Sequence, residues 1–270
     1  MKITIVIPVY NEAANLGACL AAIASQTIQP YEVIVVDNGS TDQSAKVAEV
    51  FDFVRVIREP QRGIVHARDR GYDAAHGDII ARIDADSILP QDWLEHISDF
   101  YSRLGSDHLA FTGGANFYNV RMPRAVAWLY NFLAFDLNRA LIGHPTLWGS
   151  NMALTRQQWL KVRGDVCSRQ GIHEDLDLSM HLYRRGYGIH YDRSFRIGAH
   201  LNRVRSNRQE LWEYLQWWPR TLRSHGRRSW IIAWLFGAGM LYLLTPLLNA
   251  AEYVARLAGL SPVPEALRAK

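Results

Sequence analysis

The sequence predicts an α/β fold with a mostly parallel central sheet flanked by helices. Short β-branched segments alternate with amphipathic segments through the first hundred residues. Such alternation is typical of parallel strands joined by crossover helices that cover both faces of the sheet. Hydrophobic residues make up 49% of the 270 residues, enough for a sizeable core. A late, uncharged hydrophobic stretch predicts an additional C-terminal helical appendage.

Four strands are expected in the first third of the chain, at 3–8, 32–37, 53–57 and 79–84. Their apolar, largely β-branched composition suits strands buried on both faces. The segments between them are expected to be helices because their apolar residues recur at three- and four-residue spacing. The clearest stripe follows the first strand and contains Leu16, Cys19, Leu20 and Ile23.

The second half of the chain continues with helices and short strands. Glycine and proline positions, together with capping residues such as Thr155, set the expected boundaries. We expect a helix at 93–104, a strand at 109–112 that stops at Gly113, one helix at 124–141, a strand that ends at Leu154, a helix that ends before Gly186, and two strands at 188–192 and 195–199.

Polar clusters follow three of the predicted strands, at 10–12, 37–39 and 84–86. The carboxyl ends of parallel strands are where ligands bind in such sheets. Alternation along an extended chain would point Asp84 and Asp86 the same way, and two such carboxylates suit a divalent cation that also holds a diphosphate. The alternative is a surface turn with two solvated acids. No G-x-G-x-x-G or Walker loop follows the first strand, which excludes those nucleotide-binding arrangements.

Charge and cysteine content are less specific. The net charge is +4, and arginine supplies most of the positive charge. Cys19 and Cys167 lie far apart with no C-x-x-C spacing, so neither a disulfide framework nor a zinc site is indicated. The first residues lack the pattern of a signal peptide, so we expect the catalytic part to stay in the cytoplasm.

Five motifs in order make the chain resemble family 2 glycosyltransferases, which have the GT-A fold. The resemblance covers about residues 3–200. The motifs are Pro8-Val9-Tyr10-Asn11-Glu12, Val35-Val36-Asp37-Asn38-Gly39-Ser40-Thr41-Asp42, Ala67-Arg68-Asp69-Arg70-Gly71, Asp84-Ala85-Asp86 and Glu174-Asp175-Leu176-Asp177. Two positions depart from the family pattern: Ser87 stands where a third acid is common, and Asp69 stands where asparagine is usual.

The resemblance implies inverting transfer of a sugar from a nucleotide-diphosphate donor, with a divalent cation, Mn²⁺ or Mg²⁺. It implies that Asp175 is the general base, that Asp86 and His200 hold the metal, and that Asp37 binds the edge of the base. It also implies nucleotide-sugar contacts at Pro8, Tyr10, Glu12, Asn38, Arg68 and Asp84, with Arg68 near the diphosphate and Asp84 on the ribose side. The expected acceptor contacts are Trp148, Asn151 and Glu174.

Two of these assignments have simpler alternatives. The acids of Glu174-Asp175-Leu176-Asp177 also suit an ordinary helix start, where negative charge is favoured by the helix dipole. A single histidine such as His200 is often a packed or surface residue rather than a ligand.

The C-terminal part suggests a membrane. Residues 203–228 are rich in arginine and tryptophan, and 230–248 contain no charge and would span about 28 Å as a helix. Single-stranded nucleic acid would also suit the arginines and tryptophans, but the apolar stretch favours a membrane. We expect a catalytic domain at 1–202 and a membrane-associating segment at 203–270. The alternatives are a re-entrant hairpin, an interfacial helix, a buried helix capping the domain and a dimer interface.

The sequence therefore predicts an inverting, metal-dependent glycosyltransferase at the cytoplasmic face of the plasma membrane. Its donor would be a UDP-sugar, and its acceptor a hydroxyl of a lipid-linked or cell-surface glycan. No nucleic-acid partner is expected. The alternatives are a polyprenyl-phosphate sugar synthase and a non-catalytic nucleotide-sugar binding protein.

Overall fold

The computed structural model describes residues 1–104, 108–118, 123–200 and 208–227, and single residues beyond. Within these ranges a seven-stranded sheet forms, in the order β3-β2-β1-β4-β6-β5-β7. The strands are β1 (Ile3–Val9), β2 (Glu32–Asp37), β3 (Val54–Arg58), β4 (Ile79–Ile83), β5 (Leu109–Phe117), β6 (Asn151–Thr155) and β7 (Gly188–Ala199).

The sheet is mostly parallel, as predicted. Strand β1 pairs in parallel with β2 and with β4, and β5 pairs in parallel with β7. Among the described strands, β6 alone runs against its neighbours, β4 and β5. The carboxyl ends of β1, β2 and β4 therefore meet at one edge of the sheet.

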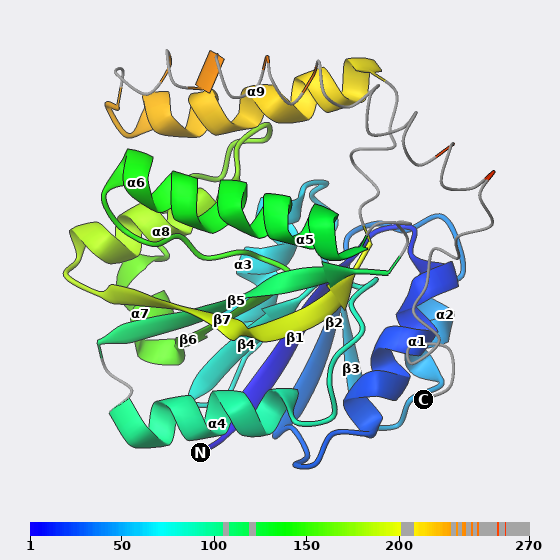
Figure 1. The fold of residues 1–270 in the computed structure, drawn as a ribbon. Helices are drawn as coiled ribbons and strands as arrows, with labels where there is room; N and C mark the ends of the chain where they lie inside the picture. Colours follow the sequence, from blue (N-terminus) through cyan, green and yellow to red (C-terminus); the bar gives the residue numbers. More distant parts are fainter. Residues whose placement is uncertain are drawn as a thin grey trace.

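Helices cover both faces of the sheet (Figure 1). Alternate β1 residues point to opposite faces: Ile5 and Ile7 pack in the core beneath α1 and α4, whereas Val6 packs in the core beneath α3, α7 and α8. The helices on the two faces are α1 (Ala13–Ala24), α2 (Ser44–Glu49), α3 (Ile64–Ala74), α4 (Trp93–Leu104), α7 (Arg156–Val162) and α8 (Glu174–Arg184).

A further helical layer lies above the sheet edge (Figure 1). It contains α5 (Pro123–Asn131), a π-helix (Phe132–Leu137), α6 (Asn138–Ile142) and α9 (Arg208–Ser224). Leu222 of α9 packs with Ile142 of α6 and with Leu176 and Met180 of α8. Because α9 contacts α8, residues far along the chain help to fix the start of α8.

Three predicted elements differ from the structure by more than a residue at one end. Strand β5 runs through Gly113 and Gly114 to Phe117 instead of stopping there, because the glycines allow a close approach: a Cβ on Gly113 would lie 1.7 Å from the Phe195 carbonyl oxygen. The two strands predicted at 188–199 form one strand, β7, with a shift in its pairing to β5. The helix predicted at 124–141 is divided by the π-helix.

The membrane prediction cannot be placed on the described chain. Most of residues 230–248 and the predicted boundary at 202–203 lie outside the described residues. Within the part of the chain that the structure describes, no helix is both long and apolar enough to cross a bilayer.

Candidate active site

The loops after β1 and β2 are joined into one rim by side-chain hydrogen bonds. Asn11 adopts a left-handed backbone conformation (φ 54°), and its Oδ1 accepts from the Thr41 amide at 2.8 Å. The Glu12 amide at the start of α1 donates to Ser44 Oγ at 2.8 Å. These bonds join the loop after β1 to the segment after β2 on the side predicted to hold a nucleoside.

Two residues of this rim are suited to a nucleoside. The buried Asp37 accepts from the Ser40 amide through Oδ1 at 2.9 Å, and no described residue hydrogen-bonds its Oδ2. The Tyr10 ring is 43% exposed and carries the Arg62 guanidinium 3.2 Å from its centroid. Arg62 was not predicted as a site residue, because it lies in a loop outside the motifs and only the fold brings it to Tyr10.

The other residues predicted to contact the nucleoside make contacts within the fold instead. The Asn38 side chain is buried; its Nδ2 donates to the carbonyls of Glu59 and Gln61, and its Oδ1 accepts from the Gly63 amide. All its amide groups are thus used to hold the loop before α3. Pro8 is buried inside β1, and Glu12 Oε2 accepts from Asn15 Nδ2 on the same helix.

The Asp84–Asp86 segment is a turn and not the end of a strand. Strand β4 stops at Ile83, and the Ser87 amide donates to the Asp84 carbonyl at 3.1 Å. We predicted that the Asp84 and Asp86 side chains point the same way because both lie in an extended strand. Since they lie in a turn, this argument is wrong. The Asp84 carboxylate accepts from Arg82 Nη2 at 3.2 Å and from Ser150 Oγ. Asp84 is held in place from β4 and from the loop before β6.

Asp86 and His200 come together although they lie far apart in the sequence. His200 follows β7, and its Nδ1 lies 4.0 Å from Asp86 Oδ2. Tyr118, which was not predicted as a site residue, donates from its hydroxyl to the Asp86 carbonyl at 2.6 Å and packs on the His200 ring. A separation of 4.0 Å is too long for a hydrogen bond. Carboxylate and imidazole are both ligands of divalent cations, so these two side chains are candidate ligands of one ion.

Asp175 lies in the first turn of α8. Its Oδ1 accepts from the Leu176 amide at 2.8 Å, and its Oδ2 accepts from the Gly149 amide at 3.1 Å. Burial and then the neighbouring Glu174 carboxylate raise the pKa of Asp175 to about 6, outweighing these two amides. A carboxyl with such a pKa is ionised at neutral pH and is a stronger base than an ordinary aspartate.

Two buried arginines, Arg82 and Arg68, contact Glu174, the residue before Asp175. Arg82 of β4, which was not predicted as a site residue, forms an ion pair with Glu174 at 2.6 Å. Burial opposes ionisation of Glu174, but the charges of Arg82 and Arg68 outweigh it and lower the pKa of Glu174. The predicted acceptor role of Glu174 does not fit this buried pair.

The predicted diphosphate contact at Arg68 does not fit either. Arg68 is completely buried in α3 and donates from Nη1 to the Glu174 carbonyl at 2.8 Å. Asp69, the departure from the family pattern, accepts from Arg68 Nε at 2.8 Å. Arg68 therefore contacts the start of α8, and its side chain is not exposed to a ligand.

The predicted acceptor contacts divide in the same way. Trp148 is partly exposed, and its ring lies 5.9 Å from that of Tyr130, whose hydroxyl is in the electrostatic environment of Asp175 and Asp84. Asn151, in contrast, is completely buried at the start of β6. Its Oδ1 accepts from Trp93 Nε1, and its Nδ2 donates to the carbonyls of Gly114 and Phe195.

We expect Asn151→Ala to destabilise the fold by about 3 kcal/mol, because it leaves buried polar groups of Trp93, Gly114 and Phe195 without partners. Urea unfolding of the wild type and the variant measures the difference. Thr27→Ala, which removes an exposed hydrogen bond to Glu95, is the control and should cost less than about 1 kcal/mol. An Asn151 variant of wild-type stability would show that this position is not structural.

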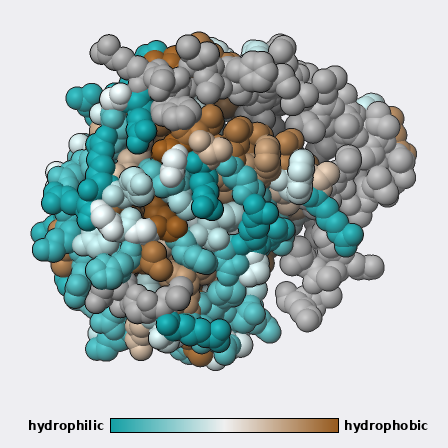
Figure 2. Space-filling model, turned by 60° about the vertical axis from the view of Figure 1, so that its left-hand side comes forward, coloured by the Kyte–Doolittle hydropathy of each residue, from teal (hydrophilic) through white to brown (hydrophobic). Residues whose placement is uncertain are grey.

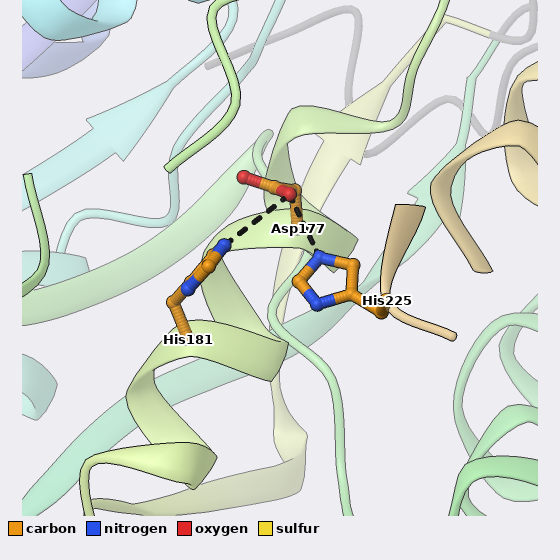
Figure 3. Close-up of side chains that lie close together, drawn as sticks. All are labelled: Asp177, His181 and His225. Carbon is orange, nitrogen blue, oxygen red and sulfur yellow. Dashed lines mark hydrogen bonds and ion pairs between the residues drawn. The ribbon is translucent and has the colours of Figure 1, made fainter. Parts of the chain in front are cut away.

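Asp177 belongs to a different cluster, with His181 and His225 (Figure 3). Asp177 Oδ1 lies 2.8 Å from His225 Nε2 and 3.6 Å from His181 Nε2, and Oδ2 accepts from the Cys167 amide. Burial opposes ionisation of Asp177, but the two histidines and the amide outweigh it and hold its pKa far below the ordinary range. These residue types could also ligate a metal, but here they bind one another and join α8 to the residues just after α9.

Known proteins share this fold. A mannosyltransferase from Pyrobaculum calidifontis, PcManGT, in complex with GDP-Man and Mn²⁺, superposes with a TM-score of 0.62 at 22% identity, covering 95% of this chain and 74% of that one. Glucosyl-3-phosphoglycerate synthase from Mycobacterium tuberculosis, in complex with Mn²⁺, UDP and phosphoglyceric acid, superposes with a TM-score of 0.60 at 20% identity, covering 83% and 78%. The fold is that of GT-A glycosyltransferases.

The sequence defines the family more narrowly. The family model described as glycosyl transferase family 2 matches residues 4–162, so the chain belongs to that family, as predicted. Glycosyltransferase AglE of Haloferax volcanii is 39% identical over 112 residues, 39% of this chain and 37% of that protein. Glycosyltransferase GlyG of Streptococcus pneumoniae is 31% identical over 122 residues, 43% and 39%. The matches thus span about two fifths of these relatives.

Proposed function

We propose that the protein is an inverting, metal-dependent glycosyltransferase that moves one sugar from a nucleotide-diphosphate sugar to an acceptor hydroxyl. The main support is that Arg82 contacts both Asp84, in the turn just after β4, and Glu174, the residue before Asp175. The carboxylates on the donor side and the proposed base thereby belong to a single site at the sheet edge, which is where α/β sheets bind ligands.

The chemistry follows from the state of Asp175. An acceptor hydroxyl gives its proton to the Asp175 carboxylate as its oxygen bonds to C1 of the donor sugar, and the bond from C1 to the diphosphate oxygen breaks. Attack from the side opposite the leaving group inverts the configuration at C1. A divalent cation bound at Asp86 and His200 would offset the negative charge that develops on the leaving diphosphate.

The rim residues suit the nucleoside of the donor. Tyr10 offers an exposed ring on which a base can stack, and Asp37 offers a carboxylate oxygen to the edge of the base. Two structural neighbours were solved with a guanosine or uridine nucleotide and Mn²⁺. We propose a UDP-sugar as the donor.

An acceptor with an apolar part is supported by the surface beside the site. Trp128, Phe132 and Leu133, all in one helical stretch, are exposed hydrophobic residues, and Figure 2 shows a hydrophobic area in the upper half of the molecule. We propose a lipid-linked glycan as the acceptor, used at the cytoplasmic face of a membrane. A phosphate acceptor, as in a polyprenyl-phosphate sugar synthase, is already an anion, so the raised pKa of Asp175 favours a hydroxyl instead.

The donor assignment is tested by nucleoside diphosphate release from a panel of UDP- and GDP-sugars, with Mn²⁺, Mg²⁺ or a chelator, in the presence of a lipid extract. We expect release from at least one UDP-sugar that stops with the chelator. Release from GDP-sugars alone would overturn the choice of uridine. Binding of a donor without release under any condition would favour a nucleotide-sugar binding protein.

The rate should depend on pH through Asp175. Because the base must be ionised, kcat/KM is expected to fall about tenfold per pH unit below a midpoint near 6, the raised pKa of this carboxyl. A pH–rate profile with a fixed, saturating concentration of metal measures the midpoint. A midpoint near the ordinary aspartate value of 3.8 would contradict the assignment of Asp175 as a desolvated base.

A further inference from the structure

Arg82 is a charged residue where the sheet otherwise contains apolar side chains. It lies inside β4, opposite Val6 of β1 and Met152 of β6, and its side chain is 3% exposed. Its Nε is buried without a hydrogen-bond partner. Buried ion pairs are often no more stabilising than apolar residues of similar size, so stability alone does not explain an arginine here.

The guanidinium contacts three parts of the site at once. Nη1 donates to Glu174 Oε1 at 2.6 Å, and Nη2 donates to Asp84 Oδ1 at 3.2 Å. A Cβ on Gly149 would lie 2.2 Å from Nη1, so the guanidinium packs directly against the backbone of Gly149. The amide of that same Gly149 donates to Asp175 Oδ2 at 3.1 Å.

We propose that Arg82 is the positioning residue that sets Asp84 on the donor side and Asp175 on the acceptor side in one fixed arrangement. It acts on Asp175 through Glu174 and through the backbone of Gly149 and does not touch the substrate. The planar guanidinium of an arginine has hydrogen-bond donors in fixed directions and can hold two carboxylates in this way, whereas the single ammonium of a lysine cannot. This inference rests on the proposed function, because it needs Asp175 to be the base.

The arrangement also places opposite charges near Asp175. The charged and titratable groups that face it are Glu174 of α8, Arg82 of β4 and Tyr130 of α5. The Glu174 carboxylate disfavours ionisation of Asp175, and the Arg82 guanidinium favours it. Removing the Glu174 charge and then the Arg82 charge should therefore shift the titration midpoint of Asp175 in opposite directions. Such shifts are not expected if Arg82 has a purely structural role.

The first test compares Glu174→Gln with the double variant Arg82→Met/Glu174→Gln. The carboxyl carbon of Asp175, observed by NMR with labelled aspartate and assigned with Asp175→Asn, gives the titration midpoint without any donor. We expect the midpoint to fall by about one pH unit in Glu174→Gln and to rise again by about one unit when Arg82 is also replaced. An unchanged midpoint in both variants would overturn the proposal. This measurement gives a result even if the wild type transfers no sugar, so failure of the proposed function would be recognised separately.

The second test measures turnover. The double variant replaces a buried ion pair by neutral residues of similar size, so it should fold, yet we expect kcat to fall at least about tenfold because Asp84 and Asp175 are no longer held together. Arg82→Lys keeps the positive charge but not the planar guanidinium. It should lose turnover while keeping the titration midpoint of Asp175 within about half a pH unit of the wild-type value.

The matched control is Arg55→Met/Glu32→Gln, which removes an Arg–Glu pair of 2.8 Å between β3 and β2. It should leave kcat and the Asp175 midpoint unchanged. Wild-type kcat in the folded double variant of Arg82 and Glu174 would show that the pair only fills space and would overturn the proposal.

Discussion

Asp175→Asn is expected to reduce sugar transfer by roughly 10²–10⁴-fold, the range that a positioned general base contributes. The side-chain amide of asparagine has the same shape but cannot take the acceptor proton. One of its oxygen contacts, to the Gly149 or the Leu176 amide, can remain, so the start of α8 should keep its structure. Nucleoside diphosphate release measures the loss, and donor affinity by calorimetry should change less than about threefold.

The same substitution should stabilise the protein at neutral pH. The pKa of Asp175 is about 6 in the folded protein, against an ordinary value of 3.8. The folded state therefore binds the proton more tightly than the unfolded chain, and the ionised carboxylate costs stability above this range, by about 1–3 kcal/mol. We expect a higher Tm for Asp175→Asn at pH 7.5 and little difference below pH 4.

Asp165→Asn is the control for both measurements, because Asp165 forms an exposed ion pair with Arg185 outside the site. It should keep wild-type turnover and Tm. Full activity of Asp175→Asn would move the base to another residue. Of the two neighbouring acids, Glu174 is paired with Arg82, and Asp177 is enclosed by His225, His181 and the Cys167 amide.

Asp86→Ala is expected to reduce turnover at least about a hundredfold and to abolish its response to added Mn²⁺, because Asp86 and His200 form the proposed cation site. His200→Ala should raise the metal concentration needed for half-maximal rate at least about tenfold. Activity against Mn²⁺ concentration in chelator-treated protein measures both effects.

Asp99→Ala, which removes an exposed ion pair on α4, should leave the metal response unchanged and serves as the control. A wild-type metal response in Asp86→Ala would place the cation elsewhere. The described chain offers another group of suitable ligands at Asp177, His181 and His225, and Asp177→Asn would then be the next variant to measure.

The parts of the fold that could be predicted are those that depend on local pattern. The strand at 32–37, the strand predicted at 79–84 except for its last residue, the cap at Thr155 and the glycine at Gly186 follow from periodicity and backbone preference. Gly113 shows the limit of this reasoning. A glycine that ends a strand and a glycine that admits a close backbone approach look the same in a sequence, and only the packing of Phe195 distinguishes them.

A sequence motif selects candidate site residues by their type, but burial decides how each residue is used. Asn38 and Asn151 resemble ligand-binding residues, but both have their side-chain hydrogen bonds satisfied inside the fold. Arg82, in contrast, was not predicted as a site residue. Its charge within an apolar strand gave no reason to select it, because its partner Glu174 lies 92 residues away. Such pairings depend on the tertiary structure and leave no local signal.

We propose that Asp175 assists a direct attack of the acceptor on the donor sugar. The most direct measurement is the anomeric configuration of the transferred sugar, read by NMR from the proton coupling at C1 of the product. With an α-linked UDP-sugar we expect a β-linked product, formed only when Asp175 is present. An α-linked product would mean retention of configuration and would contradict the proposed role of Asp175.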